Sequence, residues 1–419
     1  MNNFYLYKLS SSNWIRAQMS VEYDVVVVGG GPAGLSAARR ASSGGADVLL
    51  LELQAQIGGQ TKTSAWVPPG LLEEKFNRAI TGSVEKIRLH SVHRKLEIEG
   101  NFGKIVDRKI LDKLLASEAV KSGVDIWVGS PVTDLLEENQ KIRGVRSEAG
   151  DWSEEIESKI VIDASGAKAE WSSLFLRKIL NSNWDREETT YTNEYLMTEV
   201  PEEGKVDIYY NSVLAPSGYA WIYPAERKLA IAGVRGVRIH PDSALDEFIG
   251  QEEPSRLQGS VPIGAYRGQL PLEGPPESTT ANGIIAVGSS AGQIYPVSGH
   301  GMKYALEAGE IAGRITSEAI QEDRTENKKL QEYDHFWRNK FEEEIRVGSI
   351  LRRALEISPN QKMDALLDVL EENPELQEKF VNIFLGENLE DSVKDFLDIK
   401  ECRKIFGENT VNKLRSIYS

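Results

Sequence analysis

The chain has little cysteine and fewer basic than acidic residues: Cys402 is its one cysteine among 419 residues. A single cysteine excludes a disulfide framework and a metal cluster held by cysteines, and it favours a cytoplasmic, intracellular protein. Lys and Arg number 49 against 64 Asp and Glu, so the formal net charge at pH 7 is −15. This charge disfavours nucleic acid as a partner and electrostatic docking on anionic lipid. Any peripheral contact with a membrane must therefore use apolar surface.

Long apolar runs are also missing. None approaches the roughly 18 residues of a membrane-spanning helix. Residues 1–18 contain no continuous apolar stretch, which excludes a secretory signal, and we expect an N-terminal extension there. The hydrophobic fraction of 40% is ordinary for a globular protein, and the length exceeds one simple core. Two or three domains are expected.

The strongest signal in the chain is the stretch YDVVVVGGGPAG, residues 23–34. Its run of valines predicts a buried parallel strand that leads directly into a G-x-G-x-x-G turn. In a dinucleotide-binding turn, Gly29 permits the tight bend, Gly31 lets the backbone approach a pyrophosphate, and Gly34 lets helix and strand pack closely.

The residues after this turn complete the dinucleotide-binding pattern. Ala33 to Ser42 continues as a helix, whose N-terminus offers free N–H groups and a positive dipole end to phosphates. The next apolar strand, residues 48–51, ends on Glu52, which can accept hydrogen bonds from a ribose. Strand, glycines, helix and acid in register favour a nucleotide site over a glycine-rich turn without a ligand.

Two later segments bear on the same site. The buried strand at 159–163 runs into Ser165-Gly166, a turn of the kind that often returns the chain to the first nucleotide. Residues 187–272 alternate as antiparallel strands and contain no second G-x-G-x-x-G. They indicate an inserted sheet without a nicotinamide domain, so we expect electrons from an external donor.

A third segment opens a long helix at 302–319. Its N-terminus, after Gly299-His300-Gly301, suits an anion or an electron-rich ring carbonyl. Beyond this helix the chain turns acidic and helical. An apolar stripe in that region predicts packing rather than a site, and its members are Leu330, Tyr333, Trp337, Phe341 and Ile345.

Two histidines lie on a predicted strand pair at 84–99. Their spacing puts His90 and His93 on opposite faces of a strand, which disfavours a metal pair and favours a solvated surface. We therefore predict no metal ligands. Asp107 is expected to cap the helix that follows, which runs to Ser122.

The order of these pieces resembles flavin-dependent enzymes of the glutathione-reductase type with hydroxylase-like topology. Within that group the chain is similar to the geranylgeranyl reductase family, which includes archaeal digeranylgeranylglycerophospholipid reductases. The marker is APSGYAWIYP, residues 215–224, which resembles the family signature P-x-x-Y-x-W-x-F-P. Tyr223 stands where the family has Phe, and the matching positions are Pro216, Tyr219, Trp221 and Pro224.

The resemblance implies an α/β flavoprotein with two domains and a helical C-terminal region. The Rossmann-type FAD-binding domain would be discontinuous and take residues 19–83, 100–170 and 280–320. The inserted antiparallel sheet, the substrate domain, would take residues 84–99 and 171–279. The helical region would be residues 321–419.

The resemblance also implies the cofactor FAD and its contacts. Ala33 and Glu52 would serve the pyrophosphate and the adenosine ribose. Arg108 would reach the phosphate and ribityl region, and Val132 would pair its backbone with adenine. The full set of implied cofactor contacts is Gly29, Gly31, Ala33, Gly34, Glu52, Thr63, Ser64, Arg108, Val132, Ser289, Gly299, Gly301 and Met302.

Gly301 and Met302 are expected to offer N–H groups to the pyrimidine edge of the flavin. Other positions of this set depart from the family pattern. Ser289 replaces the usual Asp that holds a ribityl hydroxyl, so FAD binding should be weaker but not lost. The family commonly has Cys-Gly where this chain has Thr63-Ser64, so a thiol beside the flavin is absent.

The implied reaction is saturation of carbon–carbon double bonds in geranylgeranyl chains of membrane lipid precursors, with a hydride from N5 of reduced flavin. The substrate would be a prenylated lipid or a polyprenyl diphosphate. The external electron donor would be ferredoxin, reduced nicotinamide or reduced flavin. Other interpretations stay open: a monooxygenase, a flavin-dependent cyclase, or a paralogue that binds lipid or flavin without turnover.

Candidate catalytic residues follow from the same resemblance. Tyr219, Trp221 and Tyr223 share one face of their strand and are expected to line a substrate channel, although such a stripe is also typical of a sheet core. Tyr219, Trp221 and His300 are the candidate catalytic residues. His300 either donates a proton or tunes the flavin, or it is a loop histidine that orders water.

Overall fold

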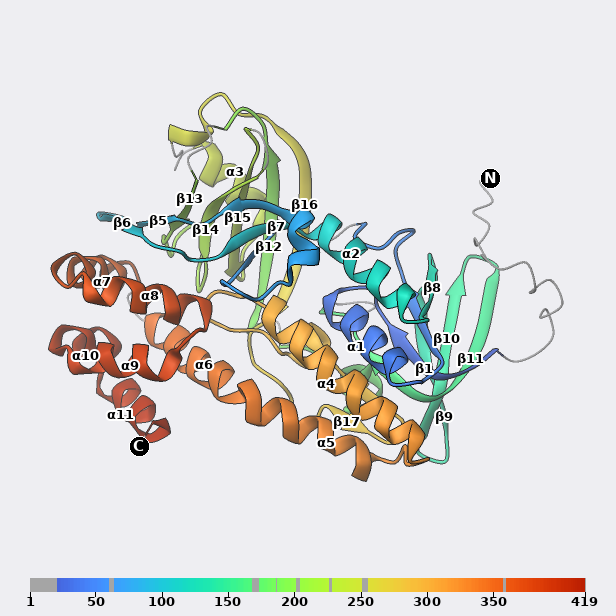
Figure 1. Ribbon diagram of the computed structural model, residues 1–419. Helices are drawn as coiled ribbons and strands as arrows, with labels where there is room; N and C mark the ends of the chain where they lie inside the picture. Colours follow the sequence, from blue (N-terminus) through green and yellow to red (C-terminus); the bar gives the residue numbers. More distant parts are fainter. Residues whose placement is uncertain are drawn as a thin grey trace.

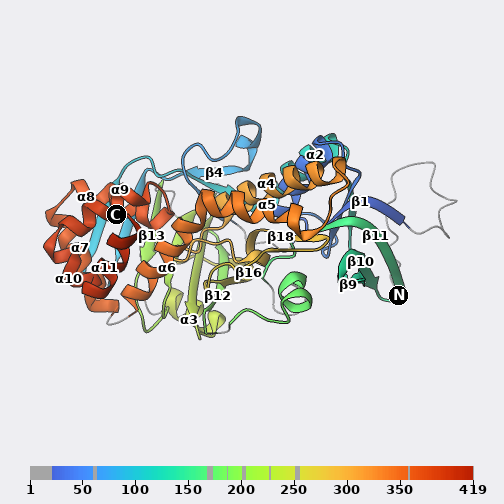
Figure 2. The same ribbon diagram turned by 90° about the horizontal axis from the view of Figure 1, so that it is seen from below.

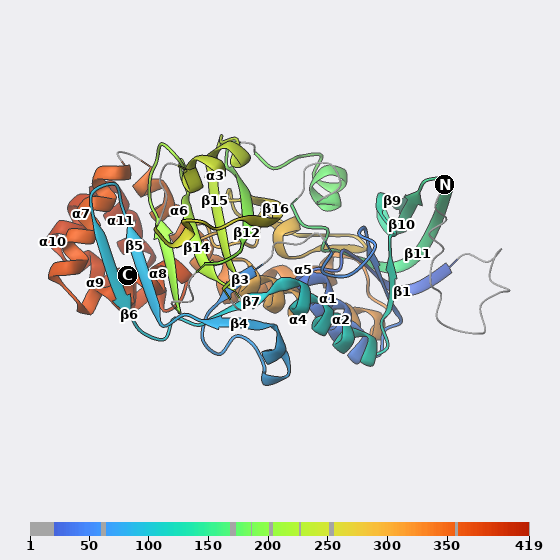
Figure 3. The same ribbon diagram turned by 90° about the horizontal axis from the view of Figure 1, so that it is seen from above.

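The computed structural model describes residues 21–59, 64–167, 173–185, 187–200, 204–225, 228–250, 255–356 and 359–418. The predicted extension at 1–18 and the predicted cofactor residue Thr63 lie outside them. In three views the described chain has helices α7–α11 at one end and strands β9–β11 at the other (Figures 1–3).

The first sheet is parallel at its centre. Its parallel strands, in order, are β18 (Ile284–Ala286), β11 (Trp152–Asp163), β1 (Val21–Val28), β2 (Val48–Glu52) and β8 (Asp125–Val128). The four consecutive valines of β1, residues 25–28, are buried on both faces of the sheet, as a parallel arrangement requires. Antiparallel strands at the margins are β17 (Thr280–Ala281), β9 (Val132–Glu138) and β10 (Lys141–Ala149).

Helices cover one face of this sheet and pack closely on one another. They are α1 (Pro32–Ser43), α2 (Arg108–Lys121) and α4 (Met302–Gln321) (Figure 1). Gly309 and Gly313 of α4 lie directly against the α1 backbone, so small residues permit the close approach. Asp107 caps α2 as predicted, since its carboxylate accepts hydrogen bonds from the N–H groups of Lys109 and Ile110.

The second sheet joins segments that are far apart in the sequence. Its strands, in order, are β16 (Pro262–Pro271), β12 (Thr189–Met197), β15 (Ala230–Val237), β14 (Tyr219–Pro224), β13 (Lys205–Tyr209), β5 (Lys86–His90) and β6 (Lys95–Glu99). Because β13 pairs with β5, residues 86–99 belong to the same sheet as residues 189–271. On the basis of this topology, we propose that the domain boundaries lie where the sequence predicts them. A small third sheet contains β3 (Ser64–Val67), β7 (Lys104–Asp107) and β4 (Ile80–Ser83).

The predicted solvated surface at His90 is wrong. β13 pairs along the edge of β5, so the His90 ring stacks on Tyr209 of that neighbouring strand with centroids 4.0 Å apart, and its Nε2 lies 3.0 Å from Asp207 Oδ1. Burial lowers the pKa of His90, against the opposing effect of Asp207. His93, in contrast, is exposed.

The C-terminal region is helical. Its helices are α5 (Asn327–Trp337), α6 (Glu343–Leu355), α7 (Pro359–Glu372), α8 (Glu375–Leu385), α9 (Leu389–Asp398), α10 (Lys400–Phe406) and α11 (Glu408–Ile417). The apolar stripe predicted as packing is buried along its whole length. Helix α5 runs beside α4, while α7–α11 gather next to β5 and β6 (Figures 1 and 2). Within the described residues, no helix has the length and apolar character needed to cross a bilayer.

The contact between α1 and α4 gives a stability prediction. A Cβ added at Gly309 would lie 2.5 Å from the Ala33 carbonyl oxygen, which forces the helices apart. Gly309→Ala should lower the free energy of unfolding by about 1–3 kcal/mol in urea denaturation. Gly250→Ala is the control, because its Cβ would meet no atom within 4 Å in the part of the chain that the structure describes. Equal stability of the two variants would contradict this packing.

Candidate active site

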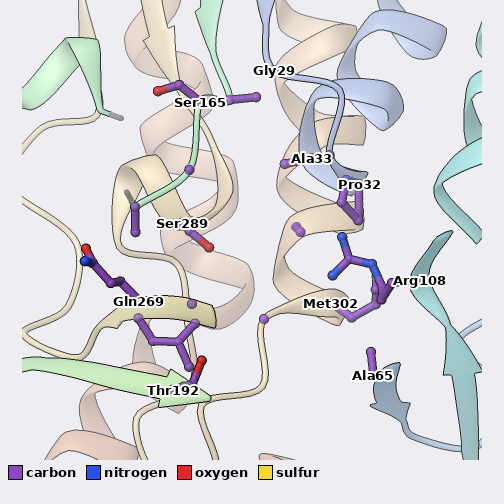
Figure 4. A pocket seen from close by; sticks show the side chains of 18 of the residues that line it. Gly29, Pro32, Ala33, Ala65, Arg108, Ser165, Thr192, Gln269, Ser289 and Met302 are labelled. Carbon is purple, nitrogen blue, oxygen red and sulfur yellow. The ribbon is translucent and has the colours of Figure 1, made fainter. Parts of the chain in front are cut away.

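A cavity of about 400 Å³ lies where the carboxyl ends of the parallel strands face the second sheet (Figure 4). Such an edge is the usual ligand site of open α/β sheets. Its wall contains the ends of β1, β2 and β11, the first turns of α1 and α4, and one face of β14. The cofactor motifs and the aromatic strand therefore share one space.

The glycine turn after β1 has the geometry of a phosphate cradle. Gly29 has φ of 105°, its N–H donates to the Leu51 carbonyl at 2.8 Å, and an added Cβ would collide with the Ala164 carbonyl. A Cβ at Gly34 would collide with the Gly29 carbonyl. A Cβ at Gly31 would meet no atom of the described residues within 4 Å and would point into open space. Gly31 thus leaves room for a ligand.

Glu52 is fixed at the end of β2 by backbone donors. Its two carboxylate oxygens accept hydrogen bonds from the N–H groups of Gly30 and Gln54, each at 2.7 Å. Val132, the first residue of β9, lies on the same wall. The carboxylate is held beside the glycine turn, where an adenosine ribose would bind in a dinucleotide fold.

Arg108 brings a positive charge to the cavity wall, next to Pro32 and Met302 in Figure 4. Its Nε and Nη2 each donate to Asp112 at 3.0 Å, and the Asp112 side chain is fully buried. Burial raises the pKa of Asp112, against the opposing effect of Arg108. The paired carboxylate orients the guanidinium at the cavity.

The loop before α4 is held by the second sheet. Tyr219 Oη donates to the Ser298 carbonyl at 2.7 Å, and Arg235 Nη2 donates to the Val297 carbonyl at 2.5 Å. This loop and the first turn of α4 place Gly299, His300, Gly301 and Met302 on the cavity wall, and Ser289 lies on the same wall.

The aromatic face of β14 closes the cavity. Tyr219, Trp221 and Tyr223 are buried, and the successive ring centroids lie 5.5 and 5.8 Å apart. Gly233 on β15 leaves the space that the Trp221 indole fills. Burial raises the pKa of Tyr219 and of Tyr223, so both phenols keep their protons at neutral pH.

His300 faces this strand between two other aromatic rings. Its ring centroid lies 5.7 Å from that of Trp66 and 5.9 Å from that of Phe384. Trp66 is fixed by its indole N–H, which donates to the Phe102 carbonyl at 2.7 Å. The histidine is thus oriented within a largely apolar enclosure.

Most of the predicted site residues therefore come together. The cavity wall contains Gly29, Gly31, Ala33, Glu52, Arg108, Val132, Tyr219, Trp221, Tyr223, Ser289, Gly299, His300, Gly301 and Met302. Gly34 packs behind the turn rather than lining this wall, and Ser64 begins β3.

Sequence reasoning missed other residues around the cavity, among them Trp66, Thr192, Arg235 and Phe384. Trp66 lies on β3, which follows β2 directly in the chain. The other three come from strands and helices distant in sequence, and no motif marks them.

Comparison with known proteins defines the class. A family model described as FAD dependent oxidoreductase matches residues 24–169. Together with the cradle at Gly31, the fixed Glu52 carboxylate and the oriented Arg108 guanidinium, this identifies an FAD-dependent oxidoreductase. The residues present fit the cofactor.

Curated relatives define the family. The digeranylgeranylglycerophospholipid reductase of Methanocaldococcus jannaschii is 32% identical over 365 residues, which cover 84% of this chain and 91% of the relative. Digeranylgeranylglycerophospholipid reductase 1 of Methanococcoides burtonii is 30% identical over 366 residues, which cover 83% and 87%. The chain belongs to the digeranylgeranylglycerophospholipid reductase family.

Solved structures agree with the fold. A geranylgeranyl bacteriochlorophyll reductase-like protein from Thermoplasma acidophilum superposes with a TM-score of 0.81 at 25% identity, over 95% of this chain and 100% of that one. The flavin-dependent brominase Bmp2 has a TM-score of 0.70 at 18% identity, over 87% and 94%, and shows the shared fold alone. The predicted flavoprotein fold is confirmed.

The cradle at Gly31 gives a prediction for cofactor binding. Gly31→Val should yield folded apoprotein, because the new side chain occupies ligand space without touching protein atoms. Flavin absorbance of the purified protein measures the loss, and thermal melting checks the fold. Gly250→Val is the control and should retain FAD. Full flavin absorbance in Gly31→Val would remove the basis for this site.

Ser289 gives a second prediction at the same cavity. Ser289→Asp should bind FAD at least as tightly as the wild type, since a charged acceptor replaces a neutral one at a ribityl hydroxyl. Ser289→Ala, which has no acceptor, should raise the dissociation constant of FAD by up to about tenfold. Equilibrium dialysis measures both. Looser binding in Ser289→Asp would show that the side chain does not face the ribityl group.

Proposed function

We propose that this protein saturates carbon–carbon double bonds of geranylgeranyl chains in membrane lipid precursors. The observation that carries the proposal is the buried aromatic face of β14, which opens directly on the cofactor cavity. An isolated double bond offers no polar handle, so an enzyme must position it by apolar contact and exclude water. The names of the curated relatives support a prenylated lipid as the substrate.

The proposed cofactor contacts follow the geometry of the cavity. Gly31 and the first turn of α1 hold the pyrophosphate, Glu52 the adenosine ribose, and Arg108 the phosphate and ribityl region. The N-terminus of α4, at Gly301 and Met302, favours negative charge on the flavin ring. When bound and reduced, FAD supplies a hydride.

A second cavity of about 340 Å³ offers room for the rest of a prenyl chain. It meets the first cavity at Tyr219 and Arg235. Its apolar wall comes mainly from the C-terminal helices and contains Leu351, Leu355, Met363, Leu366, Phe380, Ile383, Phe384, Phe396 and Phe406. We propose that the chain lies here while one double bond contacts the aromatic face.

His300 is the proposed proton donor. Histidine side chains exchange protons near neutral pH, whereas burial keeps Tyr219 and Tyr223 protonated. The position of His300 between Trp66 and Phe384, on the wall of the first cavity, allows it to face a double bond held by β14.

Contact with a membrane and with an electron donor is also proposed. Val213 is 83% exposed and belongs to the loop whose neighbours Ser212 and Ala215 line the second cavity. An exposed apolar side chain beside this cavity suits a peripheral contact with a lipid surface. The second sheet, antiparallel except for the parallel pair β13 and β5, has no nucleotide-binding turn among its described residues, which supports an external electron donor.

The function is tested by mass spectrometry of lipids. FAD-loaded protein, reduced anaerobically with dithionite, should convert a geranylgeranyl lipid to products heavier by two hydrogens per saturated bond. Trp221→Ala should keep its FAD and lose most of this activity, because it removes the centre of the aromatic face. Trp221→Phe should retain part of it.

Truncation of a buried aromatic residue costs about 3–5 kcal/mol when it only fills a core, so thermal melting must accompany the assay. Trp127→Ala is the control, since Trp127 lies on β8 and not on the cavity wall. Wild-type protein that is full of flavin and yields no saturated product from geranylgeranyl lipids would contradict the proposed function.

A further inference from the structure

Arg235 is a buried cation on the aromatic side of the second sheet. The residue is 2% exposed, and it lies on β15 opposite Tyr219 of β14. The guanidinium carbon lies 4.6 Å from the centroid of the Tyr219 ring. Nη2 donates to the Val297 carbonyl, and Nη1 lies against Gly299, where an added Cβ would be 2.7 Å away.

Apart from its contact with Tyr219, two nitrogens of the guanidinium have no hydrogen-bond partner in the described structure. Nε and Nη1 are buried without a hydrogen bond, and no described carboxylate forms an ion pair with this side chain. Burial lowers the pKa of Arg235. A buried charge without a counter-ion is costly, and unpaired buried donors are rare in native proteins. A ligand with negatively charged oxygen atoms would neutralise the buried charge and accept hydrogen bonds from the unpaired donors.

Arg235 stands on the wall that the two cavities share. On the second-cavity side, Arg352 is close enough to oppose the charge of Arg235, and its Nε is also buried without a partner. The charge of Arg352 is already compensated, since its other nitrogens pair with Glu188 and Glu356. Arg235 therefore provides a charge without an ion pair at one end of an otherwise apolar cavity, with Glu194 buried on the same face of the sheet at the first cavity.

The first-cavity side offers further donors of the same kind. Thr192 Oγ1 and Trp221 Nε1 are buried without partners, and both residues line the first cavity. The strand register puts Thr192 and Trp221 on the face that carries Arg235. A hydrocarbon chain alone would leave all these donors unsatisfied.

We infer that Arg235 binds the phosphate of a polyprenyl phosphate or diphosphate whose apolar chain occupies the second cavity. The shape and polarity match an amphipathic anion: guanidinium nitrogens at one end, and leucine, methionine and phenylalanine side chains beyond them. The double bond nearest the phosphate then lies at the wall of the first cavity, beside Tyr219. This inference deepens the proposed function, because the assignment of a prenyl chain to the ligand rests on it. Binding of the phosphate can nevertheless be measured without turnover.

The test compares two ligands that differ only in charge. Equilibrium dialysis of oxidised, FAD-loaded protein against geranylgeranyl phosphate and against geranylgeraniol, both below their aggregation limits, measures the preference for the phosphate. Wild-type protein should bind the phosphate at least about tenfold more tightly than the alcohol, as expected for hydrogen bonds to a charged group.

Variants assign that preference to one residue. Arg235→Met should abolish it while binding of the alcohol persists. Arg235→Lys keeps the charge but not the forked geometry of the guanidinium, so it should retain part of the preference for the phosphate. This variant also keeps the test decisive if Arg235→Met does not fold. The control is Arg146→Met, because Arg146 lies on β10 of the first sheet, lines neither cavity and is paired with Glu155. This variant should keep the full preference.

Three results would overturn the inference. Equal binding of phosphate and alcohol by wild-type protein would show that no anion site exists. A preference that survives in both Arg235 variants would place the site elsewhere. An unchanged preference together with a lower flavin reduction potential in Arg235→Met would assign the guanidinium to the flavin instead. Failure of the proposed function would give a different result. Protein that prefers the phosphate but does not reduce double bonds would keep the anion site and lose the proposed reaction.

Discussion

The active site depends on the bonds that tie the loop before α4 to the second sheet. Tyr219 and Arg235 come from adjacent positions on β14 and β15, and their side chains donate to the Ser298 and Val297 carbonyls. These bonds place the N-terminus of α4, the glycine cradle and the aromatic strand around one cavity. Because both donors are buried, water competes little for the carbonyls, and the bonds fix the distance between the two sheets.

The same arrangement explains how an apolar substrate can be held. The cofactor side of the cavity has the polar groups that FAD needs: backbone N–H groups at two helix N-termini, the Glu52 carboxylate and the Arg108 guanidinium. The opposite side is aromatic, and the space beyond Tyr219 is enclosed by apolar side chains of the C-terminal helices. The boundary between the two sides is where a double bond must lie.

Local patterns in the sequence predicted the parts of the site that depend on local geometry. The turn at Gly29 to Gly34 and the acid at Glu52 are set by one strand–turn–helix unit, so spacing alone located them. The common face of Tyr219, Trp221 and Tyr223 followed from strand alternation. Cavity-wall residues such as Arg235 and Phe384 arise from contacts between distant segments, and no local rule predicts them. The error at His90 has the same origin, because the strand that buries it, β13, lies more than a hundred residues later.

The central claim is that the cofactor of this protein passes its electrons to a prenyl double bond. An anaerobic stopped-flow experiment tests it most directly: protein with photoreduced FAD is mixed with a geranylgeranyl lipid or with its fully saturated counterpart. The account predicts recovery of the oxidised flavin spectrum with the geranylgeranyl lipid, at one flavin per saturated bond, and none with the saturated lipid. Flavin that stays reduced with the geranylgeranyl lipid, or is oxidised equally by both lipids, would contradict it.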